Sequence, residues 1–236
     1  ISIFAKGGEF IEHIPGTADL TAAVLTKGSK KYSSVEFAQT MEDNGIKIVP
    51  SAKADSFNMT VLTTKNDYEK TLELLNEIIN NATLDEFEIE KAKNDELNSI
   101  KKSKDVPLNL AVDNYKALIF EGSPYSYSNN ILEKNLPRVT KNDVKNYYDK
   151  VFYPQNVVIS INGNVDKETT IAELTNIFNN KKGEKFDYNK HLVQSLTTEK
   201  QACSKVKDLK TDWIIMGWQT SGVLNRKDYA TLQVID

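Results

Sequence analysis

The chain has 236 residues, of which 39% are hydrophobic and 27% are charged, and its formal net charge is −3. This length suits one large domain, or one domain with part of another, because a single core stops growing near about 250 to 300 residues. The slightly acidic balance argues against a nucleic-acid partner. The longest apolar runs are strand-sized, so we expect no membrane span, which needs roughly 20 apolar residues.

The first residues already have the pattern of a strand, and neither an initiator Met nor a signal peptide precedes them. We therefore expect an excised or processed piece whose cellular location the sequence leaves undetermined. A lone cysteine, Cys203, excludes an internal disulfide framework and does not identify the redox compartment.

The next part of the chain alternates between helix and strand signals. Residues 16–29 predict a short helix between two glycines. Ser33 and Glu36 have the spacing of a helix capping box, and the apolar face that follows ends at Gly45. Residues 46–52 and 57–63 then predict a hairpin, with the first strand at an edge of the sheet because it contains Pro50.

Helices dominate the middle of the chain. The apolar spacing predicts them over residues 67–80, 84–102, 108–120 and 141–151. We expect Thr83 and Glu86 to form a capping box at the start of the second. Residues 157–162 predict a further strand, after which one helix face is marked by Ile171, Leu174 and Phe178. The prediction is an α+β domain: a mixed, mostly antiparallel sheet covered by helices on one side.

A polar stretch near residues 181–185 interrupts these patterns. We predict a first α+β domain at residues 1–185, a linker at 186–205, and the incomplete start of a second, similar domain at 206–236. The expectation for the last segment is a strand at residues 213–220 and a helix from about Lys227.

The succession of a strand, an acidic loop, a short helix, a capped helix and a hairpin resembles the insulinase, pitrilysin and mitochondrial processing peptidase family. Its members carry an inverted zinc motif, H-x-x-E-H, within G-x-A-H-x-x-E-H-x-L-x-K-G-T. The residues that fit this frame are Gly16, Ala18, Leu25, Lys27, Gly28 and Ser29. The resemblance continues at Phe87-x-Ile89-Glu90-Lys91-Ala92-Lys93, Gly122-x-Pro124-Tyr125, Tyr148, Tyr153-x-x-Asn156 and Gly163-Asn164-Val165.

The resemblance implies a processing-peptidase-like fold in which the zinc chemistry has been lost. The two ligand histidines of the family fall on Asp19 and Ala23, and the glutamate that acts as general base falls on Ala22. An enzyme of this class needs two imidazoles one helical turn apart to hold zinc, and a carboxylate to deprotonate the attacking water. We therefore predict no catalytic residue, no metal ligand and no cofactor in this segment.

The resemblance also implies a distant glutamate ligand near Asn98 and Ser99, where no carboxylate stands. Glu96 is the nearest carboxylate, and we expect it on a different helix face from Ser99. The two histidines, His13 and His191, cannot replace the motif, because one is expected in a surface loop and the other in the linker.

Other conspicuous residues have structural interpretations. Asp19 would complement the dipole of a helix capped by Thr17. The acidic side chains Glu88, Glu90, Asp95 and Glu96 would form a solvated helix face, and residues 122–127 a tight turn. The aromatic side chains favour core packing over peptide contact: Tyr147, Tyr148, Phe152 and Tyr153.

Two functional hypotheses remain open. In the first, implied by the resemblance, the chain is a non-catalytic lobe. It would enclose an unfolded peptide together with a homologous lobe, and zinc is expected only in that second lobe. In the family, an Arg and a Tyr of the second domain can reach the active site, and their positions would follow Asp236. In the second hypothesis the chain is a structural or assembly subunit with no peptidase role. A nonstandard metal enzyme is a third interpretation, which the missing ligands oppose.

Overall fold

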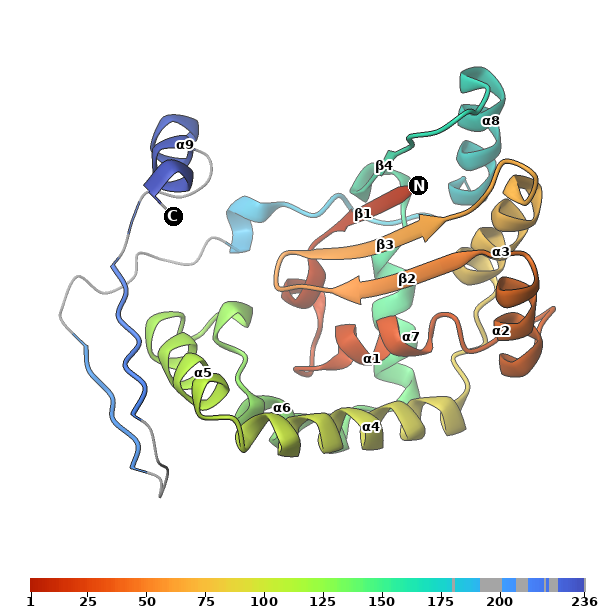
Figure 1. The fold of residues 1–236 in the computed structure, drawn as a ribbon. Coiled ribbons are helices and arrows are strands. Elements are labelled where there is room, and N and C mark those ends of the chain that lie inside the picture. Colours follow the sequence, from red (N-terminus) through yellow and green to blue (C-terminus); the bar gives the residue numbers. More distant parts are fainter. Residues whose placement is uncertain (180, 192–200, 207–211, 219, 221–224, 236) are drawn as a thin grey trace.

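The computed structural model describes residues 1–179, 181–191, 201–206, 212–218, 220 and 225–235 (Figure 1). Its strands are β1 (Ser2–Lys6), β2 (Lys47–Ala52), β3 (Ser56–Leu62) and β4 (Val157–Ser160). Its helices are α1 (Thr17–Val24), α2 (Ser34–Asp43), α3 (Tyr68–Asn80), α4 (Glu86–Lys104), α5 (Pro107–Ile119), α6 (Asn129–Asn135), α7 (Lys141–Val151), α8 (Lys167–Phe178) and α9 (Arg226–Ile235). Short 3₁₀ turns lie at Gly8–Ile11, Pro124–Ser126, Leu136–Arg138, Pro154–Asn156 and Tyr188–His191.

The described strands form one sheet in the order β2-β3-β1-β4, and every neighbouring pair is antiparallel. In β1, Phe4 lies opposite Asn58 of β3 and Val158 of β4. The predicted hairpin is confirmed as β2 and β3, and β2, which contains Pro50, lies at an edge of this sheet. The α+β architecture is confirmed.

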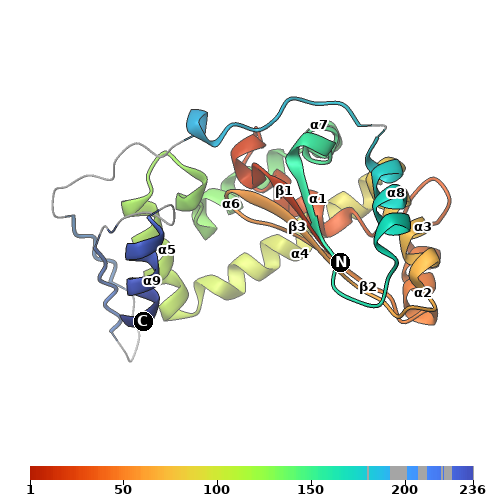
Figure 2. The same ribbon diagram turned by 90° about the horizontal axis from the view of Figure 1, so that it is seen from above.

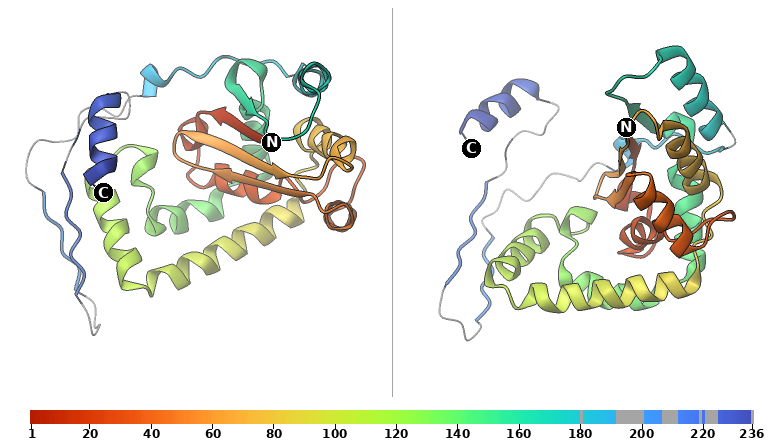
Figure 3. Two further views of the ribbon diagram at one scale, coloured as in Figure 1. Left: turned by 45° about the horizontal axis from the view of Figure 1, so that its top comes forward. Right: turned by 45° about the vertical axis from the view of Figure 1, so that its right-hand side comes forward.

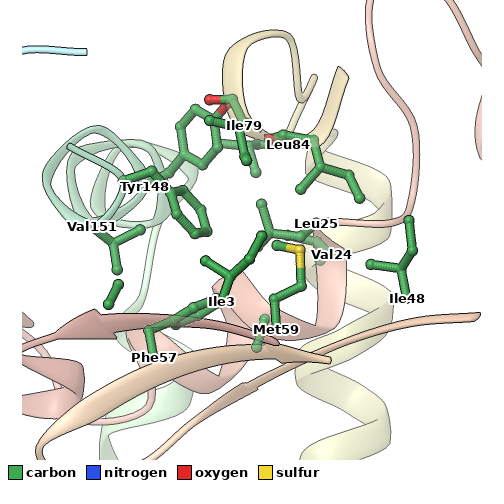
Figure 4. Packing of buried hydrophobic residues seen from close by; sticks show 14 of the residues in the cluster. Ile3, Val24, Leu25, Ile48, Phe57, Met59, Ile79, Leu84, Tyr148 and Val151 are labelled. Atoms are coloured by element: carbon green, nitrogen blue, oxygen red, sulfur yellow. Dashed lines mark hydrogen bonds between the residues drawn. The ribbon is translucent and has the colours of Figure 1, made fainter. Parts of the chain in front are cut away.

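Helices cover one face of the sheet. Because side chains alternate along a strand, Ile3, Phe57 and Met59 all point to the same side, and each is no more than 2% exposed. Figure 4 shows these three side chains meeting Tyr148 and Val151 of α7, together with residues of α1. Burying each such apolar side chain contributes on the order of 1.5 to 3 kcal/mol.

The opposite face of the sheet is open. Phe4, Val49, Leu62 and Val158 point to this side, and between 38% and 60% of each residue is exposed. The expectation of helices on one side of the sheet is therefore confirmed.

The predicted helix starts have mixed outcomes. At α2, Ser33 Oγ accepts the Glu36 N–H at 3.3 Å and the Glu36 carboxylate accepts the Ser33 N–H at 2.9 Å, which confirms the capping box. The predicted box at Thr83 is wrong: α4 begins two residues later, and Asp85 accepts the Phe87 N–H at 2.9 Å. A carboxylate directly before the first turn is the better cap because it also complements the helix dipole.

Two further differences concern helix faces and short helices. On α8, Leu174 and Phe178 are buried as expected, but Ile171 is 56% exposed and Ile177 is buried instead. The short helix α6 was not predicted, since its seven residues have too few apolar positions to show a period.

The long helix α4 runs along one side of the domain from the region of α2 and α3 to α5 (Figures 1 and 2). Helices α3 and α8 pack together at one end, whereas α5 and α6 lie at the opposite end (Figure 3). Helix α1 packs against α4 and α7, so the segment that resembles the zinc motif lies at the centre of the domain.

Chain packing continues past the predicted domain end at residue 185. Phe186 is only 8% exposed, and its N–H donates to Asn156 Oδ1 at 3.2 Å. The Tyr188 hydroxyl donates to the carbonyl of Asp55 at 2.9 Å, in the turn between β2 and β3. Part of the predicted linker, residues 186–191, is thus docked on the domain; residues 192–200 lie outside the described residues. The predicted strand at 213–220 is absent from its described residues, whereas α9 agrees with the helix expected from Lys227.

Candidate functional site at the vacant zinc motif

The positions that resemble zinc ligands meet in space. A cavity of about 400 Å³ lies between α1 and α4, and Asp19 and Ala23 line it from α1. Ser99, near which the resemblance implies the distant glutamate ligand, lines it from α4. Ala22, at the position of the general base, is 7% exposed and does not line the cavity.

One expectation about α4 is wrong. Glu96 does not lie on a separate helix face, because it lines the same cavity as Ser99. Residues three apart on a helix are neighbours on its surface, which the spacing of these two residues should have indicated. Glu96 also interacts with Asp19, whose pKa it helps to raise.

Asp19 is a half-buried acid in the first turn of α1, where it was expected to complement the helix dipole. Burial, with the nearby Glu96 carboxylate, raises the pKa of Asp19 to about 6. No residue in the described ranges donates a hydrogen bond to its side chain. The cavity also has lysines, Lys27 and Lys91, but neither forms an ion pair with Asp19.

The cap of α1 comes from an unexpected residue. Thr17 is not the cap: its hydroxyl donates to the carbonyl of Ile14 at 2.7 Å, and the cap position is occupied by Gly16. Glu12 replaces the missing side chain, accepting the Gly16 N–H at 3.1 Å and the Ala18 N–H at 2.7 Å. A signal for this was present in the sequence, since glycine at a cap position leaves the first N–H groups without a side-chain acceptor.

The residues at the motif do not fit zinc. At the three expected ligand positions, Asp19, Ala23 and Ser99 offer a carboxylate, a methyl group and a hydroxyl, where zinc would need two imidazoles and a carboxylate. Across the described part of the chain, no three His, Cys, Asp or Glu side chains gather closely enough to hold a metal ion. His13 is exposed, and His191 is exposed and stacked on Phe186 with the ring centroids 4.7 Å apart.

The aromatic residues around α7 belong to the core, as expected: Tyr147, Tyr148, Phe152 and Tyr153 are all at most 6% exposed. The Tyr148 hydroxyl donates to the carbonyls of Ile78 and Ile79, at the end of α3. In the predicted tight turn, the Tyr125 hydroxyl donates to Asp55 Oδ2 at 3.3 Å, so this segment connects α5 to the β2–β3 turn.

A family model described as insulinase, peptidase family M16, matches residues 8–130, and a second, described as the peptidase M16 inactive domain, matches residues 138–236. The chain belongs to the insulinase family, peptidase family M16. The N-terminal match therefore includes α1, the helix that contains Asp19, Ala22 and Ala23.

Relatives of this M16 chain include proteins without peptidase names. The non-peptidase homolog YmxG of Helicobacter pylori is 24% identical over 70% of this chain and 38% of its own length. Subunit 1 of the mitochondrial cytochrome b-c1 complex of Mus musculus is 21% identical over 68% of this chain and 32% of its length. An uncharacterized zinc protease of Rickettsia felis is 28% identical over 51% of this chain.

Solved M16 structures share the fold. A peptidase M16 inactive domain from Pseudomonas fluorescens superposes with a TM-score of 0.71 at 24% identity, over 79% of this chain and 46% of that one. A protease from Helicobacter pylori superposes with a TM-score of 0.69 at 18% identity, over 84% of this chain and 47% of that one. The chain thus spans less than half of these structures and about a third of the first curated relatives.

No described helix is both long and apolar enough to cross a membrane.

Proposed function

We propose that this chain is a non-catalytic lobe of an M16-type zinc peptidase, and that it encloses an unfolded peptide together with a homologous lobe that carries the zinc. The observation that carries this proposal is the cavity between α1 and α4. Asp19, Ala23 and Ser99 line it. The resemblance to M16 assigns these positions to the three zinc ligands, and the methyl group of Ala23 and the hydroxyl group of Ser99 do not replace an imidazole and a carboxylate.

The fold supports the role of a chamber wall. Within the described sheet, β2 and β4 are edge strands, and an extended peptide can add to such an edge through main-chain hydrogen bonds. Confinement would then hold the peptide against the zinc site of the other lobe and exclude folded proteins. Pro50 limits pairing along β2, since it has no N–H to donate.

The test is a peptide-cleavage and zinc-content assay on this chain alone, on a homologous lobe from the same organism that carries the zinc motif, and on the mixture. We expect zinc only in the other lobe, no cleavage by this chain alone, and cleavage at least about tenfold faster in the mixture than in either part, corresponding to about 1.4 kcal/mol of barrier. The matched control is a zinc lobe whose motif glutamate is replaced by glutamine. Stoichiometric zinc in this chain would contradict the proposal.

A structural role is the second candidate, favoured by the similarity to subunit 1 of the cytochrome b-c1 complex. If a tight complex forms with the other lobe and no peptide is cleaved, the structural role replaces the peptidase role.

A further inference from the structure

The helices α1 and α4 run in opposite directions along the cavity between them. Figure 1 shows the two helices side by side. The chain just after α1 meets the chain just before α4: the Thr83 N–H donates to the carbonyl of Gly28 at 3.3 Å. Ser29 and Ala82 form an antiparallel β-bridge at the same place. The start of α1 therefore lies beside the C-terminal half of α4, and the end of α1 lies beside its N-terminal half.

One end of the cavity is acidic. Asp19 of α1 and Glu96 of α4 line it there, and the charge of Glu96 acts on Asp19. Asp95 and Ser99 line the same half of the cavity. Burial and Glu96 raise the pKa of Asp19 to about 6, because a second negative charge in this place is unfavourable. A positively charged group bound at this acidic end, defined by Asp19 and Glu96, would offset both carboxylates.

The opposite end of the cavity contains two cations. Lys27 follows α1, and Lys91 lies in the N-terminal half of α4; both line the cavity, together with Glu88. Lys91 and Glu96 are five residues apart, which corresponds to about 7.5 Å along the helix. By the same rise, the eight residues from Asp19 to Lys27 span about 12 Å. The lysine end, defined by Lys27 and Lys91, is thus separated from the acidic end.

The cavity has the size of a ligand site and charges without partners. Its volume of about 400 Å³ falls within the range of roughly 300 to 1,000 Å³ that is usual for ligand pockets. Leu20, Ala23 and Ala92 give its lining an apolar part. Within the part of the chain that the structure describes, no ion pair or side-chain hydrogen bond is formed by its charged lining residues, Asp19, Lys27, Glu88, Lys91, Asp95 and Glu96. No group of the described residues is arranged to hold a metal ion, so an organic ligand fits better.

We propose that the cavity between α1 and α4 binds a short free peptide, with its N-terminal ammonium group at the acidic end and its C-terminal carboxylate at the lysine end. An extended peptide spans about 3.3 Å per residue, so charges about 7.5 to 12 Å apart correspond to roughly two to four residues. The apolar lining suits small apolar side chains between the two charges. Such peptides would be released by cleavage in the zinc-bearing lobe, so their source, though not their binding here, rests on the proposed function.

The experiment titrates this chain alone with trialanine in a calorimeter at low salt and about pH 7, where the amino group of the peptide is largely protonated and Asp19 is largely ionised. We expect saturable binding of one peptide per chain. N-acetyl-trialanine lacks the ammonium charge and trialanine amide lacks the carboxylate charge. Each should bind at least about tenfold more weakly, because a hydrogen bond between charged groups is lost. No cleavage is measured, so failure here leaves the proposed function to the assay of the two lobes.

Variants identify which end of the peptide lies at which end of the cavity. Glu96→Gln should weaken trialanine binding at least several-fold and should reduce the penalty for acetylation, since the two changes remove the same contact. Lys91→Gln should instead reduce the penalty for amidation. The matched controls are Glu86→Gln and Lys101→Gln, exposed residues of α4 that do not line the cavity, and both should bind trialanine as the unaltered chain does.

A second measurement locates the peptide in the unaltered chain. Carbon-13 NMR of the aspartate carboxyl groups should show that the pKa of Asp19, about 6 without ligand, falls when trialanine is bound, because a nearby positive charge favours the ionised form. The proposal is overturned if trialanine shows no saturable binding, if blocking either end of the peptide leaves the affinity unchanged, or if bound peptide leaves the titration of Asp19 unaltered.

Discussion

Asp19 on α1 and Ser99 on α4 line the same cavity, although the hairpin and α3 separate them in the chain. The M16 motif would place one zinc ligand at each of these positions. If that assignment is correct, the backbone brings the two positions together and the side chains are what zinc binding lacks. This makes restoration of metal binding a test of the fold.

We expect the triple variant Asp19→His, Ala22→Glu, Ala23→His to bind zinc weakly. Adding Ser99→Glu should increase the zinc affinity by at least about tenfold, which is the lower end of the loss seen when a residue that supports a metal site is removed. Two histidines leave one protein ligand missing, whereas a catalytic zinc site uses three. Zinc per chain after dialysis is the measurement.

Both of those variants should also carry Glu96→Gln. Glu96 lines the same cavity, so its carboxylate could bind the zinc in place of the glutamate introduced at position 99. Equal zinc content with and without Ser99→Glu would show that position 99 does not supply the third zinc ligand. Neither variant should cleave peptides alone, since the partner lobe is absent; cleavage by either one would contradict the need for a partner.

Asp19→Asn should stabilise the protein at pH 8 more than at pH 5. The pKa of Asp19 is raised from 3.8 to about 6 by burial and by Glu96, so its ionisation costs stability as the pH rises through about 6. The upper limit at pH 8 is about 3 kcal/mol, from about 1.4 kcal/mol per unit of pKa, and roughly half of this cost is already present at pH 5. Urea unfolding at the two pH values is the measurement, and Asp43→Asn on the exposed end of α2 is the control.

Gly8→Ala should destabilise the protein more than Gly45→Ala. Both glycines have positive φ, +46° and +60°, so alanine costs roughly 1 to 2 kcal/mol at either site. At Gly8 a Cβ would also overlap the Lys53 carbonyl oxygen and the Ser56 amide nitrogen, whereas at Gly45 the space is open. Equal losses in the free energy of unfolding would mean that the β2–β3 turn can move away.

Phe186→Ala should release the docked residues 186–191. The ring is buried against Tyr188 and His191, and the Phe186 N–H donates to Asn156. We expect trypsin to cut after Lys185 and Lys190 at least several-fold faster, because local opening precedes cleavage. The control is Tyr229→Ala on α9, which is 43% exposed. Unchanged cleavage rates at both lysines would show that Phe186 does not hold this segment.

Local patterns accounted for much of the architecture. The capping box of Ser33 and Glu36, the hairpin with Pro50 at an edge, and the helices α3, α5 and α7 depend on contacts within a few residues. The resemblance to the M16 family likewise depended on residues close in sequence, and it located Asp19, Ala22 and Ala23 on one helix.

The sequence by itself determined the type and order of most elements, because spacing along one chain segment determines them, and it predicts the loss of the zinc ligands from the residues at the motif positions. Only the tertiary structure decided that Glu12 caps α1, that Glu96 shares the cavity with Ser99, and that Phe186 docks on the domain. These relationships depend on how separate segments pack, and packing also determines the burial that raises the pKa of Glu12 and Asp19.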